Sequence, residues 1–248
     1  MRYRISHELN YSYDSPVRLS TQYLRLSPRD TGRQKVLEWK LEMPGQAMRT
    51  SDGFGNILHV LTLDKPVSEI WIHAGGTVET SGSADDPSDF TGVPLSPLIF
   101  LRPTASTRPD APLAAFAEDY RQSAGTLVGL RELAAATHAR NPAASGEEAT
   151  HSFIACCRHV GVPARYVSGY IHSPSAAGER MALSAWAEAW VGERWRSFDV
   201  RNNTQIGESH IKIAVGADYL DACPIRGVRV GGGAETLVTQ ANVMTSSQ

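Results

Sequence analysis

The sequence contains few cysteines and no long apolar run. Its three cysteines, Cys156, Cys157 and Cys223, give an odd count, and the two adjacent ones cannot easily form a strain-free bridge with each other. We therefore expect a reducing cytoplasm rather than a secreted, disulfide-rich scaffold. No apolar run approaches the roughly 18–20 residues of a membrane-spanning helix. The first residues, MRYRISHELNYSYD, alternate polar and apolar without the hydrophobic stretch of a signal peptide.

An excess of basic charge is also missing. The formal net charge is -2 over 248 residues, so no positive field favours binding to nucleic acid or to an acidic membrane surface. Hydrophobic residues make up 42% of the chain and charged residues 20%, which is typical of a soluble globular protein. The length is sufficient for one large domain or two modest ones.

The first hundred residues predict β structure. Polar and apolar residues alternate over Tyr3–Tyr13 and again over Leu37–Met43, the period of a half-buried strand. Turn residues at 52–56 precede a predicted strand at Ile57–Leu63, and another short strand is expected at Ile70–Ala74. Several short strands with regular turns indicate a small β-sandwich or a curled antiparallel sheet.

The next segment separates this β-rich part from helices. Residues 80–110 are rich in Ser, Asp, Pro and Gly, and we interpret Thr80–Phe90 as a surface loop and the remainder as an irregular connector. Helices are predicted after Pro112, where apolar residues recur at helical spacing. These residues are Leu113, Phe116 and Tyr120, then Leu130, Leu133 and Ala134.

A well-defined helix is predicted from Ser145. Ser145 and Glu148 form the S-x-x-E pattern of a capping box, and Gly161 is expected to end the helix. Its apolar stripe consists of Phe153, Ile154, Cys157 and Val160. Strands are predicted to follow at Ala164–Ile171, Ala182–Val191, Trp195–Val200 and finally Ile211–Val215, with a hairpin turn at Gly192-Glu193. Helices packed on an antiparallel sheet form an α+β domain.

Three stretches of this second half resemble the core of the bacterial transglutaminase-like family, a papain-like group of thiol enzymes. They read SGEEATHSFIACCRHVGVPARYVSGYI from Ser145, LSAWAEAW from Leu183 and RWRSFDVRN from Arg194. The N-terminal text YSYDSPVRLSTQYLRLSPR and DGFGNILHVLTL is similar to the β-rich region that precedes many such cores, and ESHIKIAVGADYLDACPIRGVRVGGG is similar to their end. The resemblance covers about Arg2 to Gly233.

The resemblance implies a catalytic triad whose first two members are missing here. Family members carry G-V-C-Q-D at the start of the helix, H-A-W on a later strand and F-D-P on the next strand. Aligned through His151–Ile171, the cysteine position falls on Gly146, the histidine position on Ser184 and the aspartate position on Asp199. Only the aspartate is retained, so the resemblance implies a protein without the family's chemistry.

The residue types at these positions agree with a loss of catalysis. A helix N-terminus stabilises a thiolate through its free N–H groups and dipole, whereas here Glu147 and Glu148 supply the negative charge instead. The hydroxyl of Ser184 has no titratable nitrogen and cannot act as a general base near neutral pH. Without a histidine to orient, Asp199 is expected to be a hydrogen-bonded carboxylate near a strand end.

The alternative is a displaced nucleophile. Cys156 and Cys157 lie about three turns into the helix, roughly 15 Å from its N-terminus, and are expected to be buried and inert. Cys223 precedes Pro224 in a predicted loop and is the better candidate for exposure, although the spacing implies no partner histidine. A Ser-His-Asp hydrolase is disfavoured because the sequence has no G-x-S-x-G motif.

A second alternative catalytic centre is a metal site near His151. Glu147, Glu148 and His151 form an E-x-x-H half-site on one helix face, but the sequence has no second half-site, and a single-metal site would need a distant ligand such as His172 or His210. We therefore predict no metal and no cofactor.

Together these observations predict two domains. Residues 1–105 are expected to form a β-rich, sandwich-like N-terminal domain with its connector, and residues 106–248 a papain-like, transglutaminase-type α+β core. The predicted function is a bacterial, cytoplasmic, non-catalytic protein that binds a peptide or protein in the former substrate cleft. Its partner would be an active relative or a second copy, and not nucleic acid or a membrane. The alternative is an amide-bond hydrolase or acyltransferase that uses a displaced nucleophile or a metal.

Overall fold

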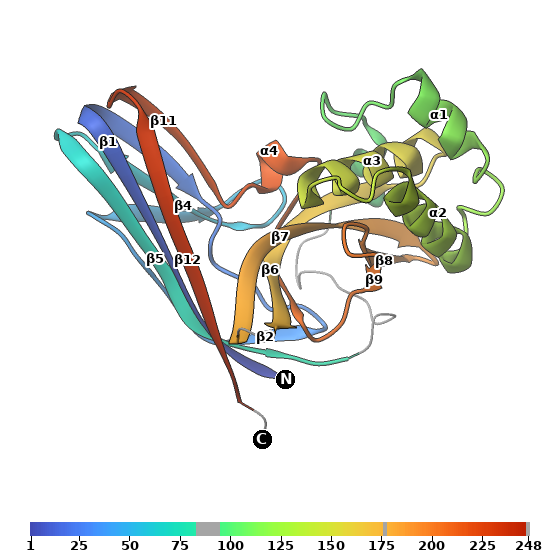
Figure 1. Cartoon of the computed structure of the whole chain (residues 1–248), viewed down its shortest axis with the longest axis horizontal. Coiled ribbons are helices and arrows are strands. Elements are labelled where there is room, and N and C mark those ends of the chain that lie inside the picture. Colours follow the sequence, from blue (N-terminus) through green and yellow to red (C-terminus); the bar gives the residue numbers. More distant parts are fainter. Residues whose placement is uncertain (83–94, 176–177, 247–248) are drawn as a thin grey trace.

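The computed structural model describes residues 1–82, 95–175 and 178–246, which form two lobes arranged as a V (Figure 1). One lobe is a curled antiparallel sheet, and the other consists of helices packed on a second sheet. The two termini lie close together at the point of the V. The fold is therefore α+β, with a β-rich N-terminal part, as predicted. The predicted loop at Thr80–Phe90 lies mostly outside the described residues.

The curled sheet is built around one long strand. Its members are β1 (Arg2–Leu24), β2 (Gln34–Glu42), β3 (Ala47–Ser51), β4 (Ile57–Leu63), β5 (Val67–Thr80), β11 (Ile225–Gly231) and β12 (Glu235–Ser246). The order is β2-β5-β1-β4-β3. The first half of β1 pairs with β5 on one side and β12 on the other, and the second half pairs with β4 and β11. The register shifts around Val17, where irregular pairing bends a strand and increases its twist.

The last two strands differ from the sequence-based expectation. The range 106–248 was assigned as a whole to the second domain, and the strand at Ile211–Val215 was expected to be the last one. Instead, β11 and β12 return to the N-terminal sheet, where Tyr3 pairs with Thr245 and Thr21 with Val228. A strand's own sequence does not specify its partner, because pairing depends on contacts far apart in the chain.

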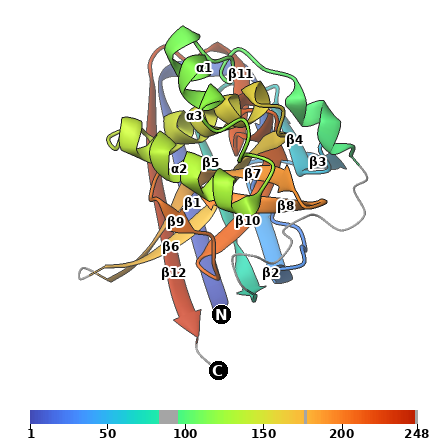
Figure 2. The ribbon, with the colours of Figure 1, turned by 90° about the vertical axis from the view of Figure 1, so that its right-hand side faces the viewer.

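The second lobe places helices on one face of an antiparallel sheet (Figures 1 and 2). A short 3-10 helix, η1 (Pro97–Leu101), precedes the α-helices. These are α1 (Ala111–Glu118), α2 (Leu127–Arg140), α3 (Gly146–His159) and the short α4 (Tyr219–Ala222). The strands are β6 (Ala164–Ser175), β7 (Gly178–Val191), β8 (Arg194–Asp199), β9 (Thr204–Gln205) and β10 (His210–Gly216), in the order β10-β6-β7-β8-β9. Among the described residues, no helix is long and apolar enough to cross a membrane.

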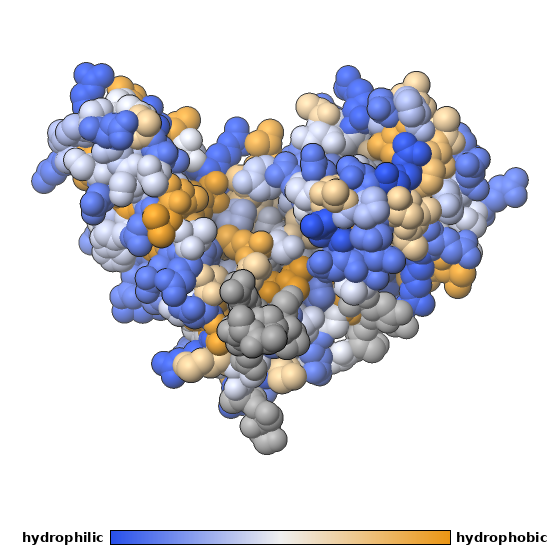
Figure 3. Space-filling model, in the orientation of Figure 1, coloured by the Kyte–Doolittle hydropathy of each residue, from blue (hydrophilic) through white to orange (hydrophobic). Residues whose placement is uncertain are grey.

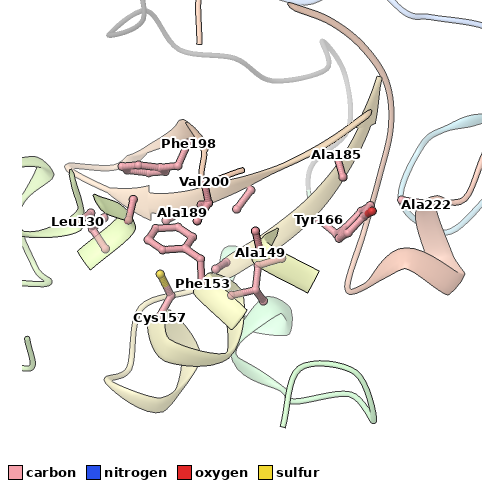
Figure 4. Close-up of a cluster of buried hydrophobic side chains, with 14 of the residues drawn as sticks. Leu130, Ala149, Phe153, Cys157, Tyr166, Ala185, Ala189, Phe198, Val200 and Ala222 are labelled. Atoms are coloured by element: carbon pink, nitrogen blue, oxygen red, sulfur yellow. The ribbon is translucent and has the colours of Figure 1, made fainter. Parts of the chain in front are cut away.

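The core of this lobe lies between α3 and the sheet (Figure 4). The predicted apolar stripe of α3 is buried. The ring of Phe153 packs at a tilt against the ring of Phe198 of β8, with the two ring centroids 5.1 Å apart. Small residues on β7, Ala185 and Ala189 among them, let the helix approach closely. Gly161 has a φ of 87°, the left-handed conformation that ends a helix, so the predicted helix end is confirmed.

The two lobes are joined through the outer edge of β10. Gln34, at the start of β2, forms two hydrogen bonds with the backbone of Lys212, each 2.8 Å long. Asn56 does the same for Val215, donating to its carbonyl oxygen at 2.7 Å and accepting from its N–H at 2.8 Å. Both amide side chains are buried, so they replace a neighbouring strand in satisfying the backbone polar groups of β10.

A buried charge cluster ties the second sheet together on the face away from α3. The Glu188 carboxylate on β7 contacts Nη2 of Arg165 on β6 and Nζ of Lys212 on β10, both at 2.6 Å. It also accepts a hydrogen bond from Ser197 of β8 at 3.1 Å. Burial alone would raise the pKa of Glu188, but the two cations hold it below its usual value.

The amide bridge at Asn56 can be tested with an isosteric change. In Asn56→Asp, an acceptor-only group would face both the Val215 carbonyl and the Asp52 carboxylate, which Asn56 now contacts at 2.9 Å. We expect a loss of at least about 3 kcal/mol in the free energy of unfolding, because a buried charge would lack its partner. Urea denaturation measures this loss.

Asn10→Asp, on the exposed face of β1, is the matched control and should change stability by less than about 0.5 kcal/mol. Equal midpoints for the two variants would show that the Asn56 bridge does not hold the lobes together.

Candidate functional site

Helix α3 begins at the hollow between the lobes, and its N-terminus has the predicted capping box. The Ser145 side chain accepts a hydrogen bond from the Glu148 N–H at 3.1 Å, and the Glu148 carboxylate accepts one from the Ser145 N–H at 2.8 Å. These hydrogen bonds hold the pKa of Glu148 below its usual value. The capping box thus satisfies the N–H groups of Ser145 and Glu148 within the chain.

The structure brings Gly146 and Ser184 together. A Cβ atom built on Gly146 would lie 3.7 Å from the Ser184 hydroxyl oxygen and 3.8 Å from the Ala185 nitrogen. These are ordinary van der Waals distances, so a side chain at position 146 would point at β7 without a clash. The two positions that the resemblance assigns to cysteine and histidine are therefore neighbours.

Asp199 contacts His210 and Asn202. Its carboxylate lies 3.1 Å from Nε2 of His210 and accepts hydrogen bonds from the side chain and the backbone of Asn202 at 2.7 and 3.1 Å. Burial would raise the pKa of Asp199, but these hydrogen bonds outweigh it and keep the pKa low. The His210 ring also packs edge-on against the Trp186 ring, with the ring centroids 5.4 Å apart.

The expectation of a hydrogen-bonded Asp199 is confirmed, but its partner was not anticipated. The sequence suggests His210 only as a distant metal ligand. Its contact with Asp199 joins β10 to β8, which are separated in the sheet by β6 and β7, so no spacing along the chain indicates it.

A cleft opens beside Gly146. It has a volume of about 280 Å³ and lies where α3, β6, β7 and the segment around α4 meet. Its lining residues are Gly146, Glu147, Tyr166, Ser168, Leu183, Ser184, Ala185, Tyr219 and Pro224. Figure 3 shows the molecule hollowed between the two lobes, with apolar residues exposed on the walls and floor of the hollow.

The cleft is lined by two aromatic rings, Tyr166 and Tyr219, and by the carboxylate of Glu147. Burial raises the pKa of Glu147, and the carboxylates of Glu148 and Asp218 raise it further. Burial likewise raises the pKa of Tyr219, with the Cys223 thiol and Glu147 as smaller contributors. Among the described residues, the lining contains one carboxylate and no lysine, arginine or histidine, so its potential favours cations.

The three cysteines are all buried and reduced. Burial raises the pKa of Cys156 to about 12 and that of Cys157 well above its usual value. Cys223, which we expected to be the more exposed thiol, is only 2% exposed, and burial raises its pKa as well. That expectation was wrong because Cys223 follows α4 and packs beneath it, with Sγ 3.8 Å from the Leu220 carbonyl oxygen.

The residues of the E-x-x-H half-site, Glu148 and His151, form hydrogen bonds with other groups of the protein. Nε2 of His151 accepts a hydrogen bond from the Tyr219 N–H at 3.1 Å, so the proton of a neutral ring lies on Nδ1, which faces Glu147 at 3.9 Å. Glu148 is held in the capping box. Within residues 1–82, 95–175 and 178–246, no group of three or more His, Cys, Asp or Glu side chains is placed to hold a metal ion.

Comparison with known proteins agrees with this architecture. Residues 3–79 match the family described as the bacterial transglutaminase-like N-terminal region, and residues 118–200 match the transglutaminase-like superfamily. An uncharacterized protein of Mycobacterium leprae is 29% identical over 270 residues, with 95% of this chain and 96% of that protein covered. An uncharacterized protein of Mycobacterium tuberculosis is 26% identical over 275 residues, covering 92% and 87% of the two chains.

A solved structure has the same fold. The crystal structure of a protein from Cytophaga hutchinsonii, described as a "putative cysteine protease", superposes with a TM-score of 0.72. The match covers 100% of this chain and 92% of the other at 18% sequence identity. The predicted fold class is thereby confirmed.

The three native thiols should be unreactive toward thiol reagents in the folded protein. Because burial raises the pKa of all three, we expect Ellman's reagent to titrate none of them within minutes in buffer and all of them in denaturant. The absorbance of the released thiolate measures this. Rapid modification of Cys223 under native conditions, abolished by Cys223→Ser, would contradict the burial of this side chain.

A thiol introduced at the start of α3 should be accessible but poorly ionised. In Gly146→Cys the side chain has room, and we expect iodoacetamide to alkylate it while the native cysteines stay unmodified. The neighbouring carboxylates oppose the thiolate, so adding Glu147→Gln and Glu148→Gln should lower the thiol pKa by about one unit and speed alkylation at neutral pH by up to roughly tenfold.

Glu132→Gln, on the exposed face of α2, is the matched control and should leave the rate unchanged. An introduced cysteine that stays unreactive in the folded protein would mean that position 146 does not face an open cleft.

Proposed function

This chain belongs to the bacterial transglutaminase-like family, and we propose that within it the protein is a non-catalytic member that binds a peptide segment in the cleft beside Gly146. The neighbouring placement of Gly146 and Ser184 carries this proposal, since a Cβ atom added at position 146 would lie 3.7 Å from the Ser184 hydroxyl oxygen. At the position where a thiol would be activated by an imidazole, the chain has a hydrogen atom and a hydroxyl group. Members of a triad act as a unit, so the loss of both nucleophile and base removes this route to amide-bond chemistry.

The alternative of a displaced active centre has less support. The Cys223 thiol is 2% exposed and its pKa is raised by burial, which is the opposite of an activated nucleophile. A metal near His151 would have to displace the hydrogen bond from Tyr219 and would lack further protein ligands among the described residues.

The cleft has the chemistry of a peptide-binding site. Tyr166, Tyr219, Leu183 and Pro224 offer apolar and aromatic surface, and the 280 Å³ volume accommodates about one large side chain of a ligand. The carboxylate of Glu147 lies on the wall, with Asp218 near enough to raise its pKa. We therefore propose that the cleft prefers peptides with a lysine or arginine side chain over acidic ones.

The partner that supplies this peptide is proposed to be a protein in the cytoplasm, either an active relative or a second copy. The three reduced thiols are consistent with a reducing compartment. β12 pairs with β1 and exposes Leu237, Val238 and Met244. Exposed apolar residues on a strand at the border of a sheet are a common basis for association between protein chains.

Peptide display followed by direct binding measurements tests the proposal. We expect a random peptide library to yield basic sequences whose binding is weakened by at least about tenfold in Gly146→Trp, because the indole would fill the cleft. Gly53→Trp is the matched control: this exposed turn glycine has no atoms within 4 Å of an added Cβ. Isothermal calorimetry with the selected peptides measures both variants.

Catalysis is measured on the same protein. We expect no turnover of peptide amides or of glutamine side chains above the buffer rate. Turnover that disappears in Cys223→Ser, or on treatment with a chelator, would establish the alternative function. Selected peptides that bind wild type and Gly146→Trp equally would remove the cleft as the binding site.

A further inference from the structure

A second group of reactive side chains lies outside the cleft, on the N-terminal sheet. Along the first half of β1, Tyr3, Ile5, His7 and Leu9 are buried, so Ser6 points to the opposite, solvent-facing side of the sheet. On that side, Ser6 pairs with Gly75 of β5, and His73, two residues before Gly75, pairs with Glu42 of β2. Three neighbouring strands thus place a serine, a histidine and a glutamate side by side.

The contacts between these residues follow the atom order of a serine-hydrolase triad. The Ser6 hydroxyl oxygen lies 3.0 Å from Nε2 of His73, and Nδ1 of His73 lies 3.2 Å from the Glu42 carboxylate. A carboxylate only accepts hydrogen bonds, so in the neutral ring Nδ1 carries the proton. Nε2 is then free to accept the hydroxyl proton of Ser6, which is the arrangement that general-base activation of a serine requires.

Lys40 forms an ion pair with Glu42, the third residue of the group. Its ammonium lies 2.6 Å from the other oxygen of Glu42. Contacts with Lys40 and His73 keep the pKa of Glu42 below its usual value, so this carboxylate is ionised near neutral pH and oriented toward the imidazole.

A surface depression lies next to the serine. It has a volume of about 520 Å³ and includes Arg4, Ser6, Trp39, Lys40, His73 and Gly75 in its lining. A Cβ atom at position 75 would lie 2.9 Å from the Ile5 carbonyl oxygen and 3.4 Å from Nε2 of His73. A glycine at this position therefore keeps open the space in which a substrate would meet Ser6 and His73.

We propose that Ser6, His73 and Glu42 form a second, independent site that reacts with small carboxylic esters, with Ser6 as the nucleophile. His73 is the general base, and Glu42 is a positioning residue. The side-chain N–H groups of Arg4 border the depression and are available to stabilise a developing oxyanion, whereas the Lys40 ammonium is held by Glu42. Because these are side chains at the surface rather than fixed backbone donors, the site suits esters with good leaving groups and not amides.

The reaction requires no co-reactant besides water. Ser6 Oγ attacks the ester carbonyl carbon while its proton moves to Nε2 of His73. The tetrahedral intermediate breaks the bond to the alkoxy group, which takes the proton from Nε2 and leaves as an alcohol. Water then attacks the acyl-serine with His73 again accepting its proton, which releases the carboxylic acid and restores Ser6.

A fluorophosphonate probe tests the nucleophile directly. We expect the native protein to be labelled at Ser6, as located by peptide mass spectrometry, and Ser6→Ala to abolish the labelling. His73→Gln should slow labelling by about a hundredfold, the range expected for loss of a general base. Glu42→Ala should slow it as well, whereas Glu42→Gln should retain part of the rate, because its amide oxygen can still accept a hydrogen bond from Nδ1–H of His73.

Replacement of the serine by cysteine gives a second, independent readout. The native thiols are buried, so Ser6→Cys would present a new accessible thiol beside an imidazole. We expect iodoacetamide to modify it at least about tenfold faster at neutral pH than the thiol of Ser12→Cys, which lies on the same face of β1 without a histidine contact.

Two results would overturn this proposal: probe labelling that is unchanged in Ser6→Ala, or equal alkylation rates for the two introduced thiols. Neither result bears on the cleft, because peptide binding at Gly146 is measured with Ser6 and His73 intact.

Discussion

The arrangement of the two lobes depends on hydrogen bonding along both edges of strand β10. One edge of β10 pairs with β6 through backbone hydrogen bonds, and the other edge is closed by the side-chain amides of Gln34 and Asn56 from the N-terminal lobe. A buried strand edge without partners would leave several polar groups unsatisfied, each at a cost of about 1–3 kcal/mol. The two amides remove that cost only when the lobes are docked in this one orientation. The hollow between the lobes therefore has a fixed shape.

The charge cluster around Glu188 favours one pairing register of β6 and β7 and contributes less to the net free energy of unfolding. Bringing three charged groups into the interior costs desolvation free energy that their mutual attraction only partly offsets. A slip of one residue between β6 and β7 would turn Glu188 toward the apolar face that packs on α3. There it would be separated from Arg165 and Lys212, so the cluster disfavours a slip of one residue. In this register Ser184 lies opposite Gly169 and next to the start of α3.

Local features of the fold could be predicted from the sequence, and contacts between distant segments could not. The capping box at Ser145, the helix end at Gly161 and the strands of the second sheet each follow from residues a few positions apart. The neighbouring placement of Gly146 and Ser184 followed from the family resemblance, which carries three-dimensional information that periodicity does not.

The failures share one physical cause. The return of β11 and β12 to the first sheet, the burial of Cys223 and the pairing of Asp199 with His210 all depend on partners that the local sequence does not specify. The Ser6, His73 and Glu42 contacts belong to the same class, because these residues come from three strands separated by long stretches of chain. A search for local motifs such as G-x-S-x-G cannot find them.

Asp199 is a buried carboxylate that is stabilised by His210 and Asn202. In a triad, the aspartate orients the histidine, and loss of that histidine would leave a buried carboxylate without a partner, at a cost of several kcal/mol. Here His210 and Asn202 fill that role, and their hydrogen bonds lower the pKa of Asp199 despite its burial. At the other end of the site, Glu147 and Glu148 satisfy the positive end of α3. The buried carboxylate of Asp199 and the positive end of α3 thus both have electrostatic partners within this chain.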